Sequence, residues 1–156
     1  MSYQRPASGA PRLSVIRSAR PLTLALTWMP RVGTTADAVR GVAQRRAQNP
    51  ERINACLTEI GELTAQGSDA LTSGDLAQLG ALFDRNHELL RELGVSNTTL
   101  DERCAYWRDA GARGAKLSGA GCGGVCLGLF EERERAERAA AALDAPTWVV
   151  ELPASR

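Results

Sequence analysis

The sequence has 156 residues, of which 44% are hydrophobic and 24% charged, and its net charge is +1. This is the composition of an ordinary globular protein with one core, so we expect a single domain. The 19 basic residues are balanced by 18 acidic ones, which argues against a nucleic-acid surface. No apolar run reaches the ~18–20 residues of a membrane span, and residues 1–12 are expected to be a flexible lead-in without a signal-peptide core. We therefore expect a cytoplasmic protein that makes no membrane contact.

The spacing of cysteine and histidine gives no support for a metal site. Cys56, Cys104, Cys122 and Cys126 include no C-x-x-C pair and have no histidine cluster beside them, so neither a zinc site nor a redox pair is predicted. His87 is the single histidine of the sequence. A histidine-based catalytic triad would therefore depend on that one residue.

The residue pattern between positions 13 and 49 predicts two strands followed by a helix. Residues 13–16 are expected to form a short strand. In the next strand, residues 22–28, large apolar residues alternate with smaller ones at period two and give one strongly apolar face, made of Leu22, Leu24, Leu26 and Trp28. Thr34 or Thr35 can cap a helix that ends at the Asn49-Pro50 step.

Three more helices are predicted from apolar spacing and capping residues. Asn49 can cap a helix that begins at Pro50 and runs to about residue 72. Asp75 opens a capping-box pattern before a leucine-striped helix, which Gly94 stops in a left-handed conformation. The third helix is expected over residues 99–110.

The remaining residues show the alternation typical of strands, interrupted by one charged helix. Strands are expected over residues 114–118, 124–130 and 147–152, and a helix over residues 131–145. The order of elements predicts an α+β fold in which a mostly antiparallel sheet is covered by a layer of helices on one side.

A glycine-rich loop joins two of these strands. The stretch KLSGAGCGGVCLGLF, residues 116–130, contains five glycines. One interpretation is a tight hairpin that needs positive φ, and the other is a loop whose backbone N–H groups point inward and bind an anion. The spacing matches neither G-x-x-x-x-G-K-[ST] nor G-x-G-x-x-G, and a strand rather than a helix follows it. Two common phosphate-binding motifs are thereby excluded.

The sequence on both sides of the loop resembles that of a known family. GAKLSGAGCGG is similar to the third conserved motif of the GHMP kinases, and its surroundings look most like mevalonate kinases. NHELLRELGVS at residues 86–96 and AGARGAKLSGAG at residues 110–121 resemble the helix-turn-helix-strand run of bacterial and archaeal members. PLTLALTWMPRVGTTADAV resembles the first strand of their C-terminal half and the loop after it. Because the resemblance extends from about Gly9 to Glu151, it is more specific than a short glycine motif.

This resemblance implies a GHMP kinase C-terminal domain of ferredoxin-like type over residues 13–153. Complete enzymes of the family use ATP and Mg²⁺ to phosphorylate a small-molecule alcohol, which for mevalonate kinases is mevalonate in the isoprenoid precursor pathway. Their N-terminal domain carries an ATP phosphate loop and a catalytic aspartate. The sequence contains nothing like P-x-x-x-G-L-G-S-S-A, and its earliest acidic residue is Asp37. We therefore expect the N-terminal ATP-binding domain to be absent and the chain to need either that missing half or a second copy of itself for catalysis.

The resemblance also suggests which residues lie near phosphates and substrate. We assign no catalytic residue and no metal ligand to this chain. The phosphate- or substrate-proximal residues carried over from the family are Ser118, Gly119, Ala120, Gly121, Cys122, Gly123, Gly124 and Thr35.

The sequence departs from the family pattern at three places. Cys122 stands where members usually have glycine, and Ala36 replaces a residue that is often lysine or arginine. Trp28 and Met29 stand where many members have a Thr-Gly pair. Cys122 affects the shape of the loop, and Ala36 removes a possible partner for an anion. Trp28 and Met29 change the side of the site that would face the substrate.

Several residues have a structural as well as a functional interpretation. Ser118 can line a pocket or bind backbone, and Lys116 can attract phosphate or cover apolar surface with its stem. His87 on the leucine-striped helix fits a structural or rim role better than catalysis. The charged run of residues 131–138 is most simply a solvated helix face, and Cys122 and Cys126 fit packing better than ligation.

Three functions remain open from the sequence. The chain is the C-terminal domain of a mevalonate-kinase-like enzyme, or that of another GHMP kinase such as phosphomevalonate kinase. Alternatively it is a non-catalytic remnant that acts as a binding or interaction module, for which an exposed apolar face is expected.

Overall fold

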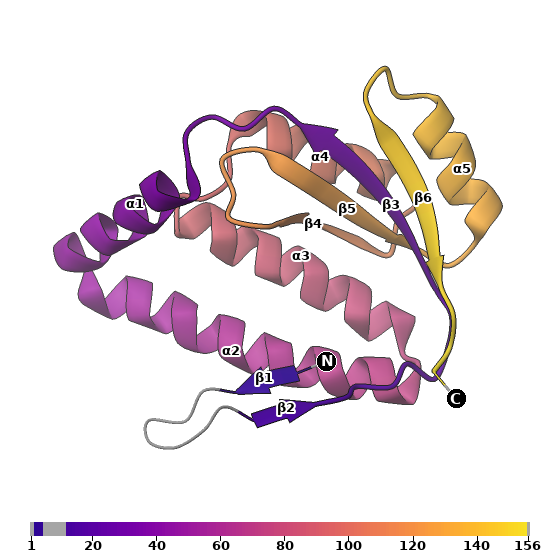
Figure 1. Ribbon diagram of the computed structural model, residues 1–156, viewed down its shortest axis with the longest axis horizontal. Coiled ribbons are helices and arrows are strands. Elements are labelled where there is room, and N and C mark those ends of the chain that lie inside the picture. Colours follow the sequence, from indigo (N-terminus) through magenta and orange to yellow (C-terminus); the bar gives the residue numbers. More distant parts are fainter. Residues whose placement is uncertain (1, 5–11, 156) are drawn as a thin grey trace.

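The computed structural model describes residues 2–4 and 12–155 of the chain. Figure 1 shows its helices and strands. In chain order these are β1 (Ser2–Gln4), β2 (Arg12–Ser14), β3 (Leu22–Met29), α1 (Thr35–Gln48), α2 (Pro50–Ser73), α3 (Leu76–Glu92), α4 (Thr98–Asp109), β4 (Gly114–Ser118), β5 (Gly124–Phe130), α5 (Arg133–Ala141) and β6 (Thr147–Leu152).

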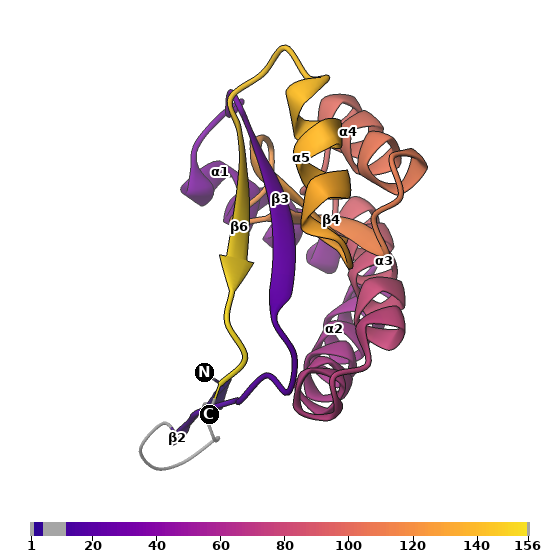
Figure 2. The same ribbon diagram turned by 90° about the vertical axis from the view of Figure 1, so that its right-hand side faces the viewer.

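A four-stranded antiparallel sheet in the order β4-β5-β3-β6 forms the centre of the fold. Helices α4 and α5 cover one face of it, α3 packs along the edge strand β4, and α2 packs against α3. Figure 2 shows these helices on one side and leaves the opposite face of β3 and β6 open. The prediction of an α+β fold with helices on one side of an antiparallel sheet is therefore confirmed.

The leucines of β3 do not lie on the face that α4 and α5 cover; Leu22 and Leu24 pack instead against a second cluster formed by Ala70, Leu76, Leu79 and Leu129. The buried residues of this strand are the alternate ones, Thr23, Ala25, Thr27 and Met29, and Trp28 is 45% exposed. Small residues on the covered face let α4 approach closely: a Cβ on Gly128 would lie 3.0 Å from the Cβ of Trp107, which is fully buried. The strand prediction is correct, but its strongly apolar face lies opposite α4 and α5, partly covered at Leu22 and Leu24 and exposed at Trp28.

The helix boundaries follow the predicted capping residues. Thr34 caps α1, and Asn49 both ends α1 and caps α2 with its side chain. Gly74 and Gly94 have positive φ at the ends of α2 and α3, as the stop signals predicted. Asp75 accepts a hydrogen bond from the amide of Gln78, while a reciprocal capping box forms at α1 instead. Local spacing therefore defines these helices.

Two expected elements differ in extent. The helix predicted over residues 131–145 spans only Arg133–Ala141: the carboxylate of Glu131 pairs with Arg113 before the helix begins, and Ala142 is its C-cap. The strand expected over residues 13–16 is β2, Arg12–Ser14, which pairs with β1 in a separate two-stranded sheet. The lead-in expected over residues 1–12 thus includes β1, and residues 1 and 5–11 lie outside the described residues.

Candidate functional site

The connection between β4 and β5 is built almost entirely from left-handed backbone. Positive φ occurs at Gly119, Gly121, Cys122, Gly123 and Gly124. Residues of this kind let the chain reverse sharply between the two strands without side chains in the way, and glycine removes the Cβ atoms that would keep an anion from the backbone. Both interpretations of the glycines, a sharp turn and an anion site, are compatible with this loop.

Two of these glycines are required by close backbone approach. A Cβ at Gly121 would overlap the carbonyl oxygen of Val95, and one at Gly123 would overlap that of Pro30. A Cβ at Gly119 would meet no atom within 4 Å. Gly121 and Gly123 therefore seat the loop on its neighbours, whereas the surface at Gly119 is open.

Cys122 adopts the left-handed region with φ of 57° and packs partly against the core. Its N–H donates to the carbonyl of Val95 at 2.7 Å, and its carbonyl accepts from the N–H of Val32 at 2.7 Å. The loop therefore tolerates a side chain where the family usually has glycine. Because the Cys122 N–H is already bonded, an anion would have to be bound by the other amides of the loop.

The segment before α1 brings a cation and Thr35 beside this loop. The Arg31 guanidinium donates to the Thr35 hydroxyl at 3.2 Å, and the aliphatic carbons of Arg31 lie 4.0 Å from the position of a Cβ on Gly124. Thr35 was predicted from the family resemblance, whereas Arg31 was not, because no local pattern in the sequence marks it. Arg31 supplies positive charge near the loop, although Ala36 removes the usual basic residue.

The start of α1 is held by a reciprocal capping box. Asp37 accepts from both the N–H and the hydroxyl of Thr34, at 2.8 and 2.7 Å, and its own N–H donates to the Thr34 hydroxyl. The hydrogen bonds from the Thr34 side chain and backbone lower the pKa of Asp37. The conformation of this helix end, next to Arg31 and Thr35, is thereby fixed.

An apolar cavity of about 280 Å³ adjoins the start of the loop. It lies between α1, α2 and the end of α3, and its lining includes Val39, Leu57, Leu93, Gly119 and Ala120. Val39 and Leu57 are 65% and 41% exposed, so the cavity opens to the surface. An apolar part of a ligand can therefore lie beside the glycine loop.

The other residues of the strand before the loop differ in their surroundings. Ser118 is exposed at the end of β4, next to Gly119. The Lys116 ammonium instead lies 5.9 Å from the centre of the Phe83 ring on α3, and burial lowers the pKa of this lysine. Ser118 is thus placed beside the loop, and Lys116 covers apolar surface away from it.

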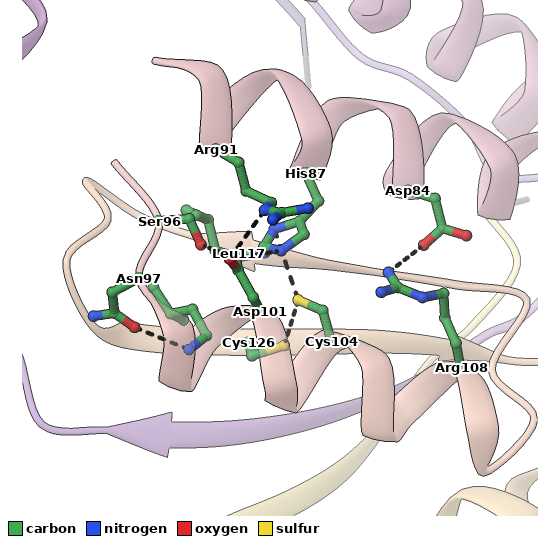
Figure 3. A network of polar contacts seen from close by, with 11 residues as sticks. Asp84, His87, Arg91, Ser96, Asn97, Asp101, Cys104, Arg108, Leu117 and Cys126 are labelled. Atoms are coloured by element: carbon green, nitrogen blue, oxygen red, sulfur yellow. Dashed lines mark hydrogen bonds and ion pairs between the residues drawn. The ribbon is translucent and has the colours of Figure 1, made fainter. Parts of the chain in front are cut away.

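His87 lies in a buried network between α3, α4 and the sheet (Figure 3). Its Nδ1 accepts the N–H of Leu117 at 3.3 Å, and its Nε2 lies 3.1 Å from Asp101. One turn earlier, Asp84 accepts the N–H of Ala115 at 2.8 Å. These two side chains of α3 satisfy alternate N–H groups on the free edge of β4, which is a structural role.

The same network contains a cysteine pair that sequence spacing did not reveal. Cys104 on α4 and Cys126 on β5 lie with their sulfurs 3.1 Å apart. The absence of a C-x-x-C motif addressed only cysteines close in sequence, whereas the fold brings together cysteines from different elements. Within residues 2–4 and 12–155, no group of three or more His, Cys, Asp and Glu residues is arranged to hold a metal ion.

The matching family profile confirms the resemblance. Residues 68–146 match the family described as GHMP kinases C terminal. The chain therefore belongs to the GHMP kinase family, as a C-terminal domain. None of the helices in the described part of the chain is long and apolar enough to cross a membrane.

Several sequence relatives of the chain are mevalonate kinases. The chain is 37% identical over 107 residues to that of Thermococcus onnurineus and 38% identical over 108 residues to that of Pyrococcus horikoshii. These matches cover 65% and 66% of this chain but 32% of each relative. The chain thus matches about a third of the length of these relatives.

Solved structures give the same result for the fold. L. major mevalonate kinase in complex with R-mevalonate superimposes with a TM-score of 0.87 at 29% identity, covering 98% of this chain and 48% of that chain. Streptococcus pneumoniae phosphomevalonate kinase superimposes with a TM-score of 0.71 at 19% identity, over 92% of this chain and 44% of that one, which shows the fold alone.

Proposed function

We propose that this chain is the C-terminal half of a cytoplasmic, ATP-dependent kinase for a small alcohol, of the mevalonate kinase type. The observation that carries the proposal is the left-handed loop of residues 119–124 with Arg31 and Thr35 beside it. A phosphate needs backbone donors and positive charge in one place; the amides of this glycine-rich loop and the neighbouring Arg31 support that role. Membership of the family and the identity to mevalonate kinases support the choice of reaction.

Within this proposal the chain binds and orients rather than performing chemistry. Backbone N–H groups of Gly119, Ala120 and Gly121 contact phosphate oxygens, and Arg31 neutralises charge that develops during transfer. ATP, when bound, supplies the transferred phosphoryl group. We assign the Mg²⁺ ligands and the base that receives the substrate proton to the other half of the enzyme. Ser118 and Thr35 provide polar contacts to the substrate.

The open face of the sheet is the proposed contact for that other half. Trp28, Trp148, Val150 and Leu152 are 45%, 55%, 39% and 45% exposed, and they lie on adjacent strands. Large apolar side chains gathered on one face mark an interaction surface. The N-terminal half of a kinase, docked there in the same chain or from a separate one, would bury them and complete the site.

A chimera tests the proposal directly. This chain replaces the matching C-terminal region of the Pyrococcus horikoshii enzyme, and ADP release is measured with mevalonate. We expect turnover, and we expect Arg31→Gln to lower kcat/KM by about 100-fold because a charge contact to the transition state is lost. The matched control is Arg40→Gln, which removes an exposed cation of α1 that pairs with Asp37, and it should leave kcat/KM within about 2-fold.

Other outcomes of the same assay separate the remaining functions. Turnover with phosphomevalonate but not mevalonate would identify another GHMP kinase. A chimera that folds, as judged by circular dichroism and cooperative melting, yet releases no ADP with either alcohol would contradict a kinase function. The exposed apolar face would then favour a non-catalytic interaction module, whose partner contacts β3 and β6.

A further inference from the structure

The Cys104–Cys126 pair is buried at the contact between α4 and β5 (Figure 3). Both side chains are 0% exposed and their Sγ atoms are 3.1 Å apart. Two sulfurs that are not bonded normally keep a larger separation, while a disulfide needs ~2.05 Å, so the pair must close by about 1 Å to form a bond. The two elements therefore already hold the sulfurs close to bonding position.

The surrounding groups can accept the proton of a reacting thiol. Nδ1 of His87 lies 3.7 Å from the Cys104 sulfur, and Nε2 lies 3.1 Å from Asp101. Because the Leu117 N–H points at Nδ1, that nitrogen carries a lone pair and the imidazole proton sits on Nε2. Nδ1 takes the proton of Cys104 by giving up its hydrogen bond from Leu117, and its new N–H then points to the Cys104 sulfur.

Asp101 is held in place to stabilise the imidazolium that results. It accepts a hydrogen bond from Ser96 at 2.6 Å and pairs with Arg91 at 2.9 Å. The arrangement of carboxylate, imidazole and thiol is that of an activated nucleophile. In addition, the hydrogen bond from Cys126 and then that with His87 lower the pKa of Cys104 to about 6, while Cys126 has a raised pKa and stays a thiol.

We propose that Cys104 and Cys126 are a reversible dithiol–disulfide site, which a hydroperoxide oxidises and a small thiol reduces. The Cys104 thiolate attacks the terminal peroxide oxygen, the O–O bond breaks, and the leaving alkoxide takes the proton from His87. Cys126 then attacks the Cys104 sulfenic acid, the S–O bond breaks, and water leaves with the Cys126 proton. Two thiols and one hydroperoxide give one disulfide, one alcohol and one water.

Burial makes the site selective for small oxidants. Neither sulfur is exposed. Opening of α4 would separate Cys104 and Asp101 from His87, so the oxidant must be small enough, like hydrogen peroxide, to reach the sulfur by local fluctuations of the packed side chains. A pair of this kind in a cytoplasmic protein acts transiently rather than as a permanent crosslink. The new bond would tie α4 to the strand that begins at Gly124, directly after the glycine loop. This inference does not rest on the proposed kinase function.

Oxidation of the reduced 156-residue chain tests the proposal. The chain has four free cysteines, Cys56, Cys104, Cys122 and Cys126. After treatment with hydrogen peroxide and alkylation in denaturant, we expect two blocked thiols and a tryptic fragment that links the peptide of Cys104 to residues 117–133, which contain Cys122 and Cys126. The midpoint of thermal unfolding should rise by about 5–10 °C and return to its starting value with dithiothreitol.

Two variants identify the bond. Cys122→Ser removes the half-buried loop thiol and should still form the link, whereas Cys126→Ala should lose both the link and the thermal shift. If all four thiols of the wild-type chain are alkylated after peroxide treatment, or if the recovered disulfides join only Cys122 residues of two chains, the proposal is wrong. These wild-type results decide the matter even if Cys126→Ala fails to fold.

Discussion

Among the described residues, Cys122 is the one non-glycine residue with positive φ. Its side chain is retained at a strained backbone position because both its N–H and its carbonyl are hydrogen-bonded to neighbouring segments. A left-handed conformation costs a non-glycine residue roughly 1–2 kcal/mol. The glycine loop therefore stores strain at the position where the sequence departs from its family.

Replacing Cys122 by glycine should relieve this strain. We expect Cys122→Gly to raise the free energy of unfolding in urea by about 0.5–1 kcal/mol, because the gain in backbone energy exceeds the entropy that glycine loses. Ala120→Gly is the matched control in the same loop, where φ is not positive, and it should lower the free energy of unfolding by a similar amount. Stabilisation by both substitutions would contradict the assignment of strain to Cys122.

The close contact of Gly121 with the backbone of Val95 predicts that a substitution there lowers the free energy of unfolding. Gly121→Ala places a Cβ against the carbonyl oxygen of Val95, so the loop must shift and lose the Cys122–Val95 hydrogen bond. We expect a loss of about 2–3 kcal/mol in urea unfolding. Gly119→Ala, which meets open space, should cost only the backbone strain of about 1 kcal/mol. Equal losses would show that contact with Val95 is not the cause.

Helix α3 is joined to strand β4 by side chains that accept hydrogen bonds from backbone N–H groups of the strand. Asp84 accepts the N–H of buried Ala115 and also pairs with Arg108 on α4. We expect Asp84→Ala to lower the free energy of unfolding by about 2 kcal/mol, because a buried donor loses its partner. Asp84→Asn keeps an oxygen acceptor and should cost less than half as much. Hydrogen exchange of the Ala115 amide should accelerate in Asp84→Ala only.

The start of α1 should respond to acid. Hydrogen bonds from Thr34 lower the pKa of Asp37 below the unperturbed value of 3.8. Stabilisation by this carboxylate is therefore fully present above pH 3.8 and is lost as the pH falls through the lower, folded-state pKa. We expect exchange of the Thr34 amide, corrected for intrinsic rates, to increase in that range. Asp37→Asn should abolish the change, and an unaltered pH dependence in this variant would contradict the assignment.

In the molecule as a whole, the exposed face of β3 and β6 carries large apolar side chains that the rest of the chain does not cover. We expect the isolated chain to associate at concentrations of tens of micromolar, and Trp148→Lys to return it to a monomer in sedimentation velocity. Val39→Lys changes a valine that is 65% exposed on α1, away from the sheet, and should leave association unchanged. A monomeric wild-type chain at these concentrations would argue against this apolar face as a contact between copies.

Much of the fold could be predicted from neighbouring residues. The bounds of β4, β5 and β6 agree with the alternating patterns, and Asn49 and Gly94 act as predicted at the helix ends. Thr35 could be carried over from family resemblance, and the structure places it beside the loop through Arg31. Arg31 itself was not predicted, because no periodicity or cap marks a side chain that folds back onto a distant loop.

Most strand and helix ends follow from the sequence alone, because capping, left-handed glycines and periodicity depend on residues a few positions apart, although β2 and α5 differ in extent from the prediction. The sequence also determined the family, through a motif and its long neighbourhood. Only the tertiary structure decided which face of β3 the helices cover, since alternation groups residues without choosing a side. The contact of Cys104 with Cys126 was likewise decided by packing of α4 on β5, because local spacing carries no information on contacts between distant segments.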